Sequence, residues 1–240
     1  MAVSIAVTRE RRDGETRCAV TPETVKKLIA LGATVSVEAG TGLGSSIPDA
    51  DYVAAGAKIV DTAEEVFAKA DMIVKVKEPQ PVERARLREG QLLFTYLHLA
   101  PDPEQTKGLL ASKCAAIAYE TVTDDRKGLP LLAPMSEVAG RIAVFSAAET
   151  LLKHNGGMGL LFCGVPGVAP ARVLVLGGGV VGLNAARMAM GLNARVTILD
   201  RSLDRLKYID ELYGDRMTTL YSTVDTVEYL LPFTDLVIGA

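Results

Sequence analysis

A glycine-rich turn limits what this chain can fold into more than any other feature of its sequence. The turn reads GGGVVG at residues 177–182 and joins an apolar run at 172–176 to a helix-like stretch at 183–190. The next apolar run closes with Asp200, about 20 residues after the turn. This order of strand, glycine turn, helix, strand and acid is typical of a dinucleotide-binding βαβ unit.

Each glycine of the turn has a separate physical task in such a unit. Gly177 can turn without the steric penalty of a Cβ atom, Gly179 lets a pyrophosphate approach the backbone, and Gly182 lets the helix pack closely on the strand. The helix that begins near Val180 would direct free N–H groups and the positive end of its dipole at the phosphates. The turn therefore predicts a nicotinamide dinucleotide cofactor.

The acid at the end of the second run indicates which nicotinamide cofactor is expected. Asp200 would accept hydrogen bonds from the ribose hydroxyls and repel a 2′-phosphate, which favours NAD over NADP. Arg201 follows it directly and weakens this preference slightly. A glycine-rich turn can also join a strand to a helix with no ligand, but the complete context favours the cofactor.

Composition and charge exclude several other classes of protein. The net charge is −3, and no cluster of Lys and Arg alternates with aromatic residues, so no nucleic-acid partner is expected. The longest apolar runs have the length of strands and the N-terminus lacks a leader pattern, so no membrane association is expected. Cys18, Cys114 and Cys163 are odd in number and widely spaced, which indicates a reducing, cytoplasmic location.

Strand-like and helix-like runs alternate from the N-terminus onwards, which predicts an α/β fold with a parallel sheet. Thr21 is the expected N-cap of the first helix, Pro22 its first residue, and Gly32 follows its end. The runs are apolar on both faces, as in strands covered by helices on either side. Strands are expected at 3–7, 34–38, 72–76, 92–96 and 115–119, and helices at 23–31, 63–70 and 103–112.

A long helix is expected to join two Rossmann-like domains, a substrate (catalytic) domain at 1–133 and an NAD-binding domain at 134–240. The helix would run from Pro134 to about His154, with an apolar stripe formed by Val138, Ile142, Phe145 and Leu152. Residues 235–240 read as the fourth parallel strand of the second domain. A dinucleotide fold normally has about six strands, so the second domain is expected to be incomplete, either as a fragment or as a subunit completed by another chain.

Three polar residues follow strands at the edge where open α/β sheets bind ligands. Arg17 could hold a carboxylate with two parallel hydrogen bonds, and Lys77 could donate to a carbonyl oxygen or act as a base. His98 could donate and accept a proton near neutral pH. Lys75 shares a strand face with Lys77, and we expect its side chain to reach solvent. Together these residues predict a site for an anionic keto or amino acid.

Five segments carry a resemblance to a known family. They read ETRCAVTP at 15–22, KVKEP at 75–79, FTYLHLA at 94–100, LAPMSEVAGR at 132–141 and GVPGV at 164–168. The chain resembles L-alanine dehydrogenase along its whole length, more closely than the NAD-binding subunit of proton-translocating transhydrogenase.

This resemblance implies a reversible oxidative deamination in which L-alanine, NAD and water give pyruvate, ammonia and NADH. In the family pattern Arg17 holds the carboxylate, Lys77 contacts the substrate and assists carbonyl or imine chemistry, and His98 is the acid/base. Tyr96 and Met135 would line the substrate pocket. The cofactor would contact Ser136, Gly177, Gly179, Val180, Gly182, Asp200, Arg205 and Ser222.

The resemblance also implies an assembly and a further acid/base residue. The family is typically a hexamer built from dimers through the helix region, so a homo-oligomer is expected. Its second acid/base residue is an aspartate in an Asp-Gln-Gly-Gly segment beyond the fourth strand of the cofactor domain, and the sequence ends before it. We therefore expect an NAD-dependent oxidoreductase of amino-acid catabolism whose turnover is impaired in this chain. The alternative is an NAD-binding module or subunit without turnover, completed by a second chain as in transhydrogenase.

Overall fold

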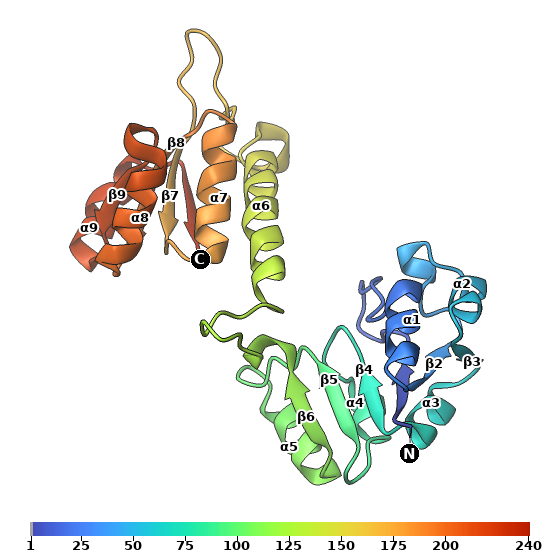
Figure 1. The fold of residues 1–240 in the computed structure, drawn as a ribbon. Helices are drawn as coiled ribbons and strands as arrows, with labels where there is room; N and C mark the ends of the chain where they lie inside the picture. Colours follow the sequence, from blue (N-terminus) through green and yellow to red (C-terminus); the bar gives the residue numbers. More distant parts are fainter. Residues whose placement is uncertain (1) are drawn as a thin grey trace. The chain divides into compact units, whose positions relative to one another are not determined.

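The computed structural model describes residues 2–240, which fold into two compact units, 2–129 and 130–240 (Figure 1). Each unit contains one parallel β-sheet with helices between its successive strands. This arrangement confirms the predicted α/β fold with parallel sheets.

The first unit is built on a six-stranded sheet in the order β3-β2-β1-β4-β5-β6. The chain passes through it twice from the centre outwards, so the strand order reverses between β1 and β4. Ligands of open α/β sheets bind in the crevice at the carboxyl ends of the strands beside such a reversal. The strands are β1 Ser4–Val7, β2 Thr34–Glu38, β3 Lys58–Val60, β4 Met72–Val74, β5 Leu92–Thr95 and β6 Ala115–Ala118. The helices are α1 Pro22–Ala30, α2 Asp49–Ala54, α3 Ala63–Lys69, α4 Pro81–Arg84 and α5 Pro103–Ser112.

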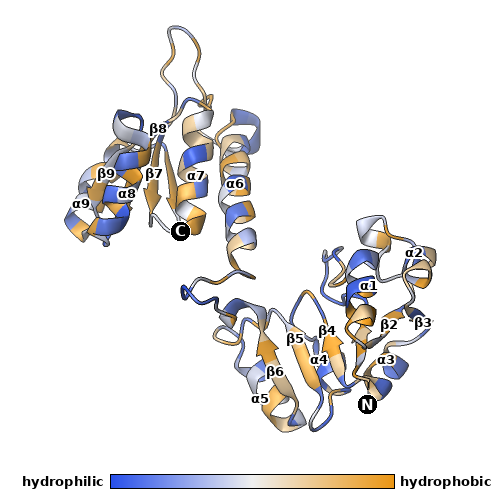
Figure 2. Cartoon of the chain, viewed as in Figure 1, coloured by the Kyte–Doolittle hydropathy of each residue, from blue (hydrophilic) through white to orange (hydrophobic). Residues whose placement is uncertain are grey.

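Two apolar cores lie on the two faces of this sheet, which explains why the central strands β1 and β4 are largely apolar (Figure 2). Val7 in β1 packs with Val25 of α1 on one face, while its neighbour Ala6 packs with Phe67 of α3 on the other. Successive strand residues point to opposite faces, so a strand covered on both sides is apolar at most of its positions. Burial of this kind fixes the sheet between its helices.

The second unit has a four-stranded sheet in the order β10-β7-β8-β9, with the predicted fourth strand paired in parallel to β7. The long helix α6 packs along α7 (Figure 1). The strands are β7 Arg172–Leu176, β8 Arg195–Asp200, β9 Thr218–Tyr221 and β10 Leu236–Gly239. The helices are α6 Ala133–Thr150, α7 Val180–Gly191, α8 Leu203–Tyr213 and α9 Val224–Leu230.

The long helix differs from the prediction in its end and in its packed face. It stops at Thr150, and His154 lies in a separate 3₁₀ turn, Lys153–Asn155. The expected apolar stripe is largely exposed, at 54% for Val138 and 58% for Phe145, whereas Gly140 is buried. Gly140 faces α7 so closely that a Cβ atom there would lie 2.2 Å from the carbonyl oxygen of Val181. The packed face of this helix is therefore determined by its close approach to α7 at Gly140, and not by the apolar stripe.

None of the helices within residues 2–240 combines the length and apolar character needed to cross a bilayer.

Candidate functional site

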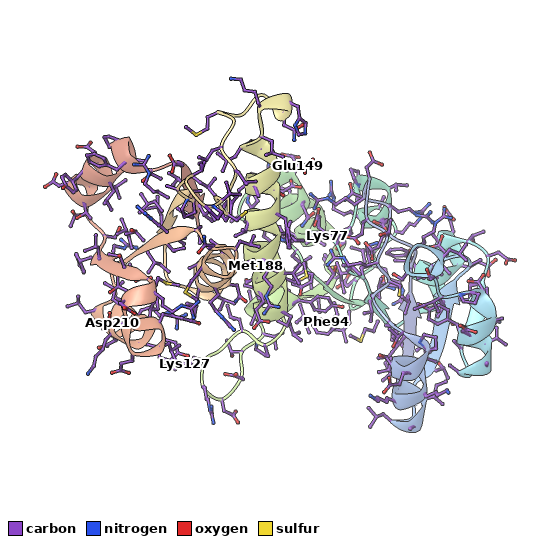
Figure 3. The ribbon with its side chains drawn as sticks, turned by 90° about the horizontal axis from the view of Figure 1, so that it is seen from above. Lys77, Phe94, Lys127, Glu149, Met188 and Asp210 are labelled. Carbon is purple, nitrogen blue, oxygen red and sulfur yellow. The ribbon has the colours of Figure 1, made fainter. Side chains whose placement is uncertain are left out.

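The candidate site of the first unit lies where β1, β4 and β5 end, beside the reversal of strand order. The segment after β1 carries Glu10, Arg12 and Arg17, the segment after β4 carries Lys77 and Glu78, and the segment after β5 carries Tyr96 and His98. Figure 3 marks Lys77 together with Phe94 on the neighbouring β5. The first unit therefore brings the predicted Arg17, Lys77 and His98 to one edge of its sheet.

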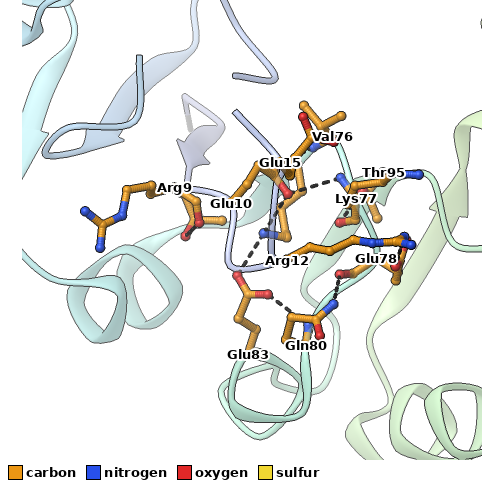
Figure 4. Close-up of polar contacts among 12 residues, drawn as sticks. Arg9, Glu10, Arg12, Glu15, Val76, Lys77, Glu78, Gln80, Glu83 and Thr95 are labelled. Carbon is orange, nitrogen blue, oxygen red and sulfur yellow. Dashed lines mark hydrogen bonds and ion pairs between the residues drawn. The ribbon is translucent and has the colours of Figure 1, made fainter. Parts of the chain in front are cut away.

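The backbone of Lys77 is held by side chains from two neighbouring segments. The buried carboxylate of Glu10 accepts the N–H groups of Val76 at 2.7 Å and of Lys77 at 3.2 Å (Figure 4). The Thr95 hydroxyl donates to the carbonyl oxygen of Lys77 at 2.9 Å. Strand β4 ends at Val74, earlier than predicted: the Lys75 N–H still donates to the carbonyl oxygen of Phe94 on β5, but those of Val76 and Lys77 donate to this carboxylate. The backbone of Lys77 is thus held by Glu10, which follows β1, and by Thr95 on β5.

Lys75 is completely buried, so the expectation that its side chain reaches solvent was wrong. Its Nζ lies 2.8 Å from Oε1 of Glu83 and 3.4 Å from Oε2 of Glu10, and all three side chains are at most 2% exposed. Burial raises the pKa of Glu10, against the opposing charge of Lys75. The strand lies at the centre of a sheet covered by helices, where a lysine is tolerated only with carboxylate partners.

Arg17 forms a two-point contact with Glu15. Its Nε donates to Oε1 at 2.8 Å and its Nη2 to Oε2 at 2.7 Å. The hydrogen bonds from Arg17 hold the pKa of Glu15 at about 2. A carboxylate with this geometry fixes the plane of the guanidinium. Arg17 is therefore a rigid cation at the sheet edge.

Tyr96 lies within an aromatic group at the end of β5. Its ring packs edge-to-face on Tyr119 with centroids 4.9 Å apart, and the ring of His98 lies 6.1 Å away. Burial raises the pKa of the Tyr96 hydroxyl, although the charge of Arg17 opposes that shift. The phenol therefore remains protonated near neutral pH and can donate a hydrogen bond.

His98 stands in a left-handed backbone conformation, with φ of 50°. Its N–H and that of Leu97 both donate to the carboxylate of Glu120, at 2.7 and 3.0 Å. Its ring nitrogen Nδ1 lies 3.3 Å from Oε2 of Glu78, and the side chain is 47% exposed. An exposed imidazole in a fixed position can exchange a proton with a bound molecule.

In the second unit, the glycine turn follows β7 where the strand order again reverses, between β7 and β10. Gly177 has φ of 104°, and a Cβ atom at Gly182 would lie 1.8 Å from the carbonyl oxygen of Gly177. A Cβ atom at Gly179 would meet no described atom within 4 Å. Glycine is therefore required at 177 by the backbone conformation and at 182 by packing. Gly179 leaves open space where α7 begins at the half-exposed Val180, as a pyrophosphate cradle requires.

The other predicted cofactor residues of the second unit surround this turn. Asp200 accepts the N–H of Gly178 at 2.6 Å and that of Ser202 at 2.8 Å. Burial works to raise the pKa of Asp200, but the N–H groups of Ser202 and Gly178 outweigh it and hold the pKa below its usual range. Arg205 donates from Nε to the carbonyl oxygen of Gly178, and the Ser222 N–H donates to the carbonyl oxygen of Asp200. These contacts join the ends of β7, β8 and β9 around the turn.

Met135 and Ser136 lie in the first turn of α6. Ser136 precedes Gly140 by one helical turn, so the two share a face of α6. Because Gly140 packs against Val181 at the start of α7, this face is directed toward the amino end of α7. Ser136 therefore lies on the side of α6 that faces the glycine turn.

The sequence reasoning missed the carboxylates of this edge, namely Glu10, Glu15, Glu78 and Glu120. Each lies a few residues beyond the end of a strand, the same signal that singled out the cationic residues. Cationic groups at this edge indicate an anion site directly, whereas the acids that orient them give no such indication from sequence alone. Among residues 2–240, no three His, Cys, Asp or Glu side chains are grouped so that they could hold a metal ion.

Two family models together match nearly all of the sequence. Residues 6–139 match "Alanine dehydrogenase/PNT, N-terminal domain", and residues 143–240 match "Alanine dehydrogenase/PNT, C-terminal domain". The chain is 53% identical to an alanine dehydrogenase of Halomonas elongata over 99% of its own length and 64% of that protein. It is 50% identical to one of Methanococcus maripaludis, over 98% of the chain and 63% of the relative. The chain thus spans somewhat less than two thirds of these relatives.

Solved structures give the same result. An L-alanine dehydrogenase structure aligns with a TM-score of 0.89 at 45% identity, over 98% of this chain and 65% of that one. A transhydrogenase from Sinorhizobium meliloti aligns with a TM-score of 0.79 at 26% identity, over 98% and 69%. The family resemblance of the sequence is confirmed: the chain belongs to the alanine dehydrogenase/PNT family.

Proposed function

We propose that this protein is an NAD-dependent alanine dehydrogenase, which interconverts L-alanine and pyruvate with release or uptake of ammonia. The observation that carries the proposal is the placement of Arg17, Lys77 and His98 at the carboxyl ends of three neighbouring strands. They lie beside the reversal of strand order, in a chain about half identical to alanine dehydrogenases. A cation for a carboxylate, a donor for a carbonyl oxygen and a group that exchanges protons are what a keto acid and an amino acid require.

Each of these residues has a distinct task in the proposed reaction. Arg17 holds the substrate carboxylate, and its two hydrogen bonds to Glu15 set the orientation of the guanidinium group. Lys77 donates to the carbonyl or imine group, and His98 moves the proton of the amine or of the attacking water. We assign Tyr96, at the end of β5, to the substrate pocket.

We assign the first domain, 1–133, to substrate and the second, 134–240, to NAD, which supplies a hydride acceptor when bound. The open space at Gly179 fits a pyrophosphate, and the acid at Asp200 fits the ribose hydroxyls. The remaining contacts are assigned to Ser136, Gly177, Val180, Gly182, Arg205 and Ser222. We also propose a cytoplasmic homo-oligomer, on the support of the dispersed cysteines and of the family resemblance.

The chain offers a matched pair of variants for testing this function, because it contains two histidines. NADH formation from L-alanine and NAD is followed by absorbance in the wild type, in His98→Ala and in His154→Ala. His154 lies on the exposed 3₁₀ turn after α6, so its variant should keep wild-type turnover. Loss of general acid–base catalysis should lower the rate of His98→Ala by about 10²–10⁴-fold. Equal rates in the two variants would contradict the role of His98, and no NADH from the wild type would contradict the activity of this chain.

A second candidate is an NAD-binding subunit without turnover, completed by a second chain. The likeness to the transhydrogenase structure favours it. Calorimetric titration with NADH, taken together with the turnover assay, distinguishes the candidates, because a subunit of this kind would bind NADH and yet produce none from alanine.

A further inference from the structure

The carboxylate of Glu78 is divided between two partners at the sheet edge. Its Oε1 pairs with Nη1 of Arg12, from the segment after β1. Its Oε2 lies 3.3 Å from Nδ1 of His98, from the segment after β5. The carboxylate therefore lies between the ends of the two strands that flank β4.

Oε2 of Glu78 needs a donor. It is buried and receives no conventional hydrogen bond from the residues that the structure describes. A buried acceptor without a donor is costly, and Nδ1 of His98 is the nitrogen that lies beside it. A small adjustment of the ring would turn this proximity into a hydrogen bond.

The backbone of His98 is fixed independently of this contact. Glu120, after β6, accepts the N–H groups of Leu97 and His98, and His98 keeps a left-handed φ that non-glycine residues rarely adopt. Such strain persists only where surrounding contacts hold it, and it is common where a side chain must point in one direction. The backbone at Leu97 and His98 thus places the imidazole ring beside Glu78.

We propose that Glu78 is a positioning residue for His98. Its carboxylate sets the tautomer of the imidazole by accepting a hydrogen bond from Nδ1–H of His98. A neutral imidazole has one N–H and one lone pair, and the hydrogen bond at one nitrogen decides which nitrogen keeps the proton. With the proton held on Nδ1, the lone pair is on Nε2, which becomes the basic atom toward the substrate. Arg12 occupies the other oxygen and so leaves Oε2 to the ring. This inference rests on the proposed acid/base role of His98.

The tautomer of His98 can be read directly from ¹H–¹⁵N spectra of the imidazole nitrogens. The spectra are recorded above about pH 8, where an ordinary imidazole is neutral. The second histidine, His154, is exposed and serves as the internal reference, and a His154→Gln variant assigns its signals. A hydrogen bond to a charged acceptor should favour the Nδ1–H form of His98 by about tenfold or more over the ratio in His154.

The variant Glu78→Ala should remove this bias and bring the tautomer ratio of His98 to that of His154. Glu104→Ala, which removes an exposed carboxylate on α5, should leave the spectrum unchanged. A predominant Nε2–H form of His98 in the wild type would overturn the inference, whether or not the variants fold. So would an unchanged ratio in a folded Glu78→Ala protein. Because the spectrum does not depend on turnover, an inactive protein with the Nδ1–H form would contradict the proposed function and leave the positioning role standing.

Discussion

Replacing Lys75 by methionine should destabilise the first unit strongly. The substitution keeps an unbranched side chain, shorter by one atom, and removes the charge that lies 2.8 Å from Glu83 and 3.4 Å from Glu10. Two buried carboxylates would then lack their counter-charge. Removing one partner of a buried ion pair costs about 3–5 kcal/mol. We expect a loss of this size in the free energy of unfolding near neutral pH.

The loss should become smaller in acid. Burial already raises the pKa of Glu10, and Lys75 is the largest opposing influence, so the pKa must rise further without it. A carboxyl group whose folded pKa exceeds its unfolded value stabilises the fold below the unfolded pKa, and this contribution is lost as pH rises through the folded pKa. The deficit of Lys75→Met should therefore shrink as the pH falls from neutral toward the ordinary pKa of a carboxyl group.

The assay is unfolding of the whole chain in urea, monitored by hydrogen exchange in the peptides that cover residues 1–129. These peptides report on the first unit by itself. Lys69→Met is the matched control, because Lys69 is 71% exposed and pairs with Glu65 within α3. Exposed pairs of this kind contribute about 0.3–0.5 kcal/mol. Equal losses in the two variants, or a Lys75→Met deficit that grows in acid, would refute the reasoning.

Two further predictions concern other contacts. The side-chain carboxyl ¹³C signal of Glu15 should titrate with a pKa of about 2, so its contribution to stability is present above the ordinary glutamate pKa of 4.5 and is lost as pH falls toward 2. Arg17→Gln should return the midpoint toward 4.5, and an unchanged midpoint would count against the contact. Gly182→Ala should destabilise the second unit by about 1–3 kcal/mol in chemical unfolding, because its Cβ would meet the carbonyl oxygen of Gly177. Gly191→Ala, whose Cβ meets no described atom within 4 Å, should not destabilise the unit, and equal stabilities of the two variants would contradict the packing argument.

Local patterns predicted the elements well because the forces behind them are local. Thr21 caps α1 and Pro22 is its first residue, as expected from the sequence. Strands β2 and β7 and helix α5 have the predicted bounds, since apolar runs ended by turn residues leave few alternatives. The placement of Arg17, Lys77 and His98 at one edge followed from the rule that parallel strands end on the same side.

Contacts between distant segments could not be predicted in the same way. Lys75 looks like a residue that reaches solvent until Glu10 and Glu83 are brought beside it from separate segments. The packed face of α6 depends on the approach of α7 at Gly140, which an apolar stripe does not reveal. The carboxylate that lies beside the His98 ring follows a different strand, so only the folded sheet joins them.

The central claim is that the glycine turn of the second unit binds NAD, and calorimetric titration with NADH tests it most directly. In the structure a Cβ atom at Gly179 meets no described atom within 4 Å, so Gly179→Ala should fold with wild-type stability while its methyl group obstructs the pyrophosphate. Gly191→Ala, at the far end of α7, is the control. We predict that wild type and Gly191→Ala bind NADH equally and that Gly179→Ala binds at least about tenfold more weakly, a loss of about 1.4 kcal/mol. Absence of binding by the wild type, or equal affinity in Gly179→Ala, would contradict the account.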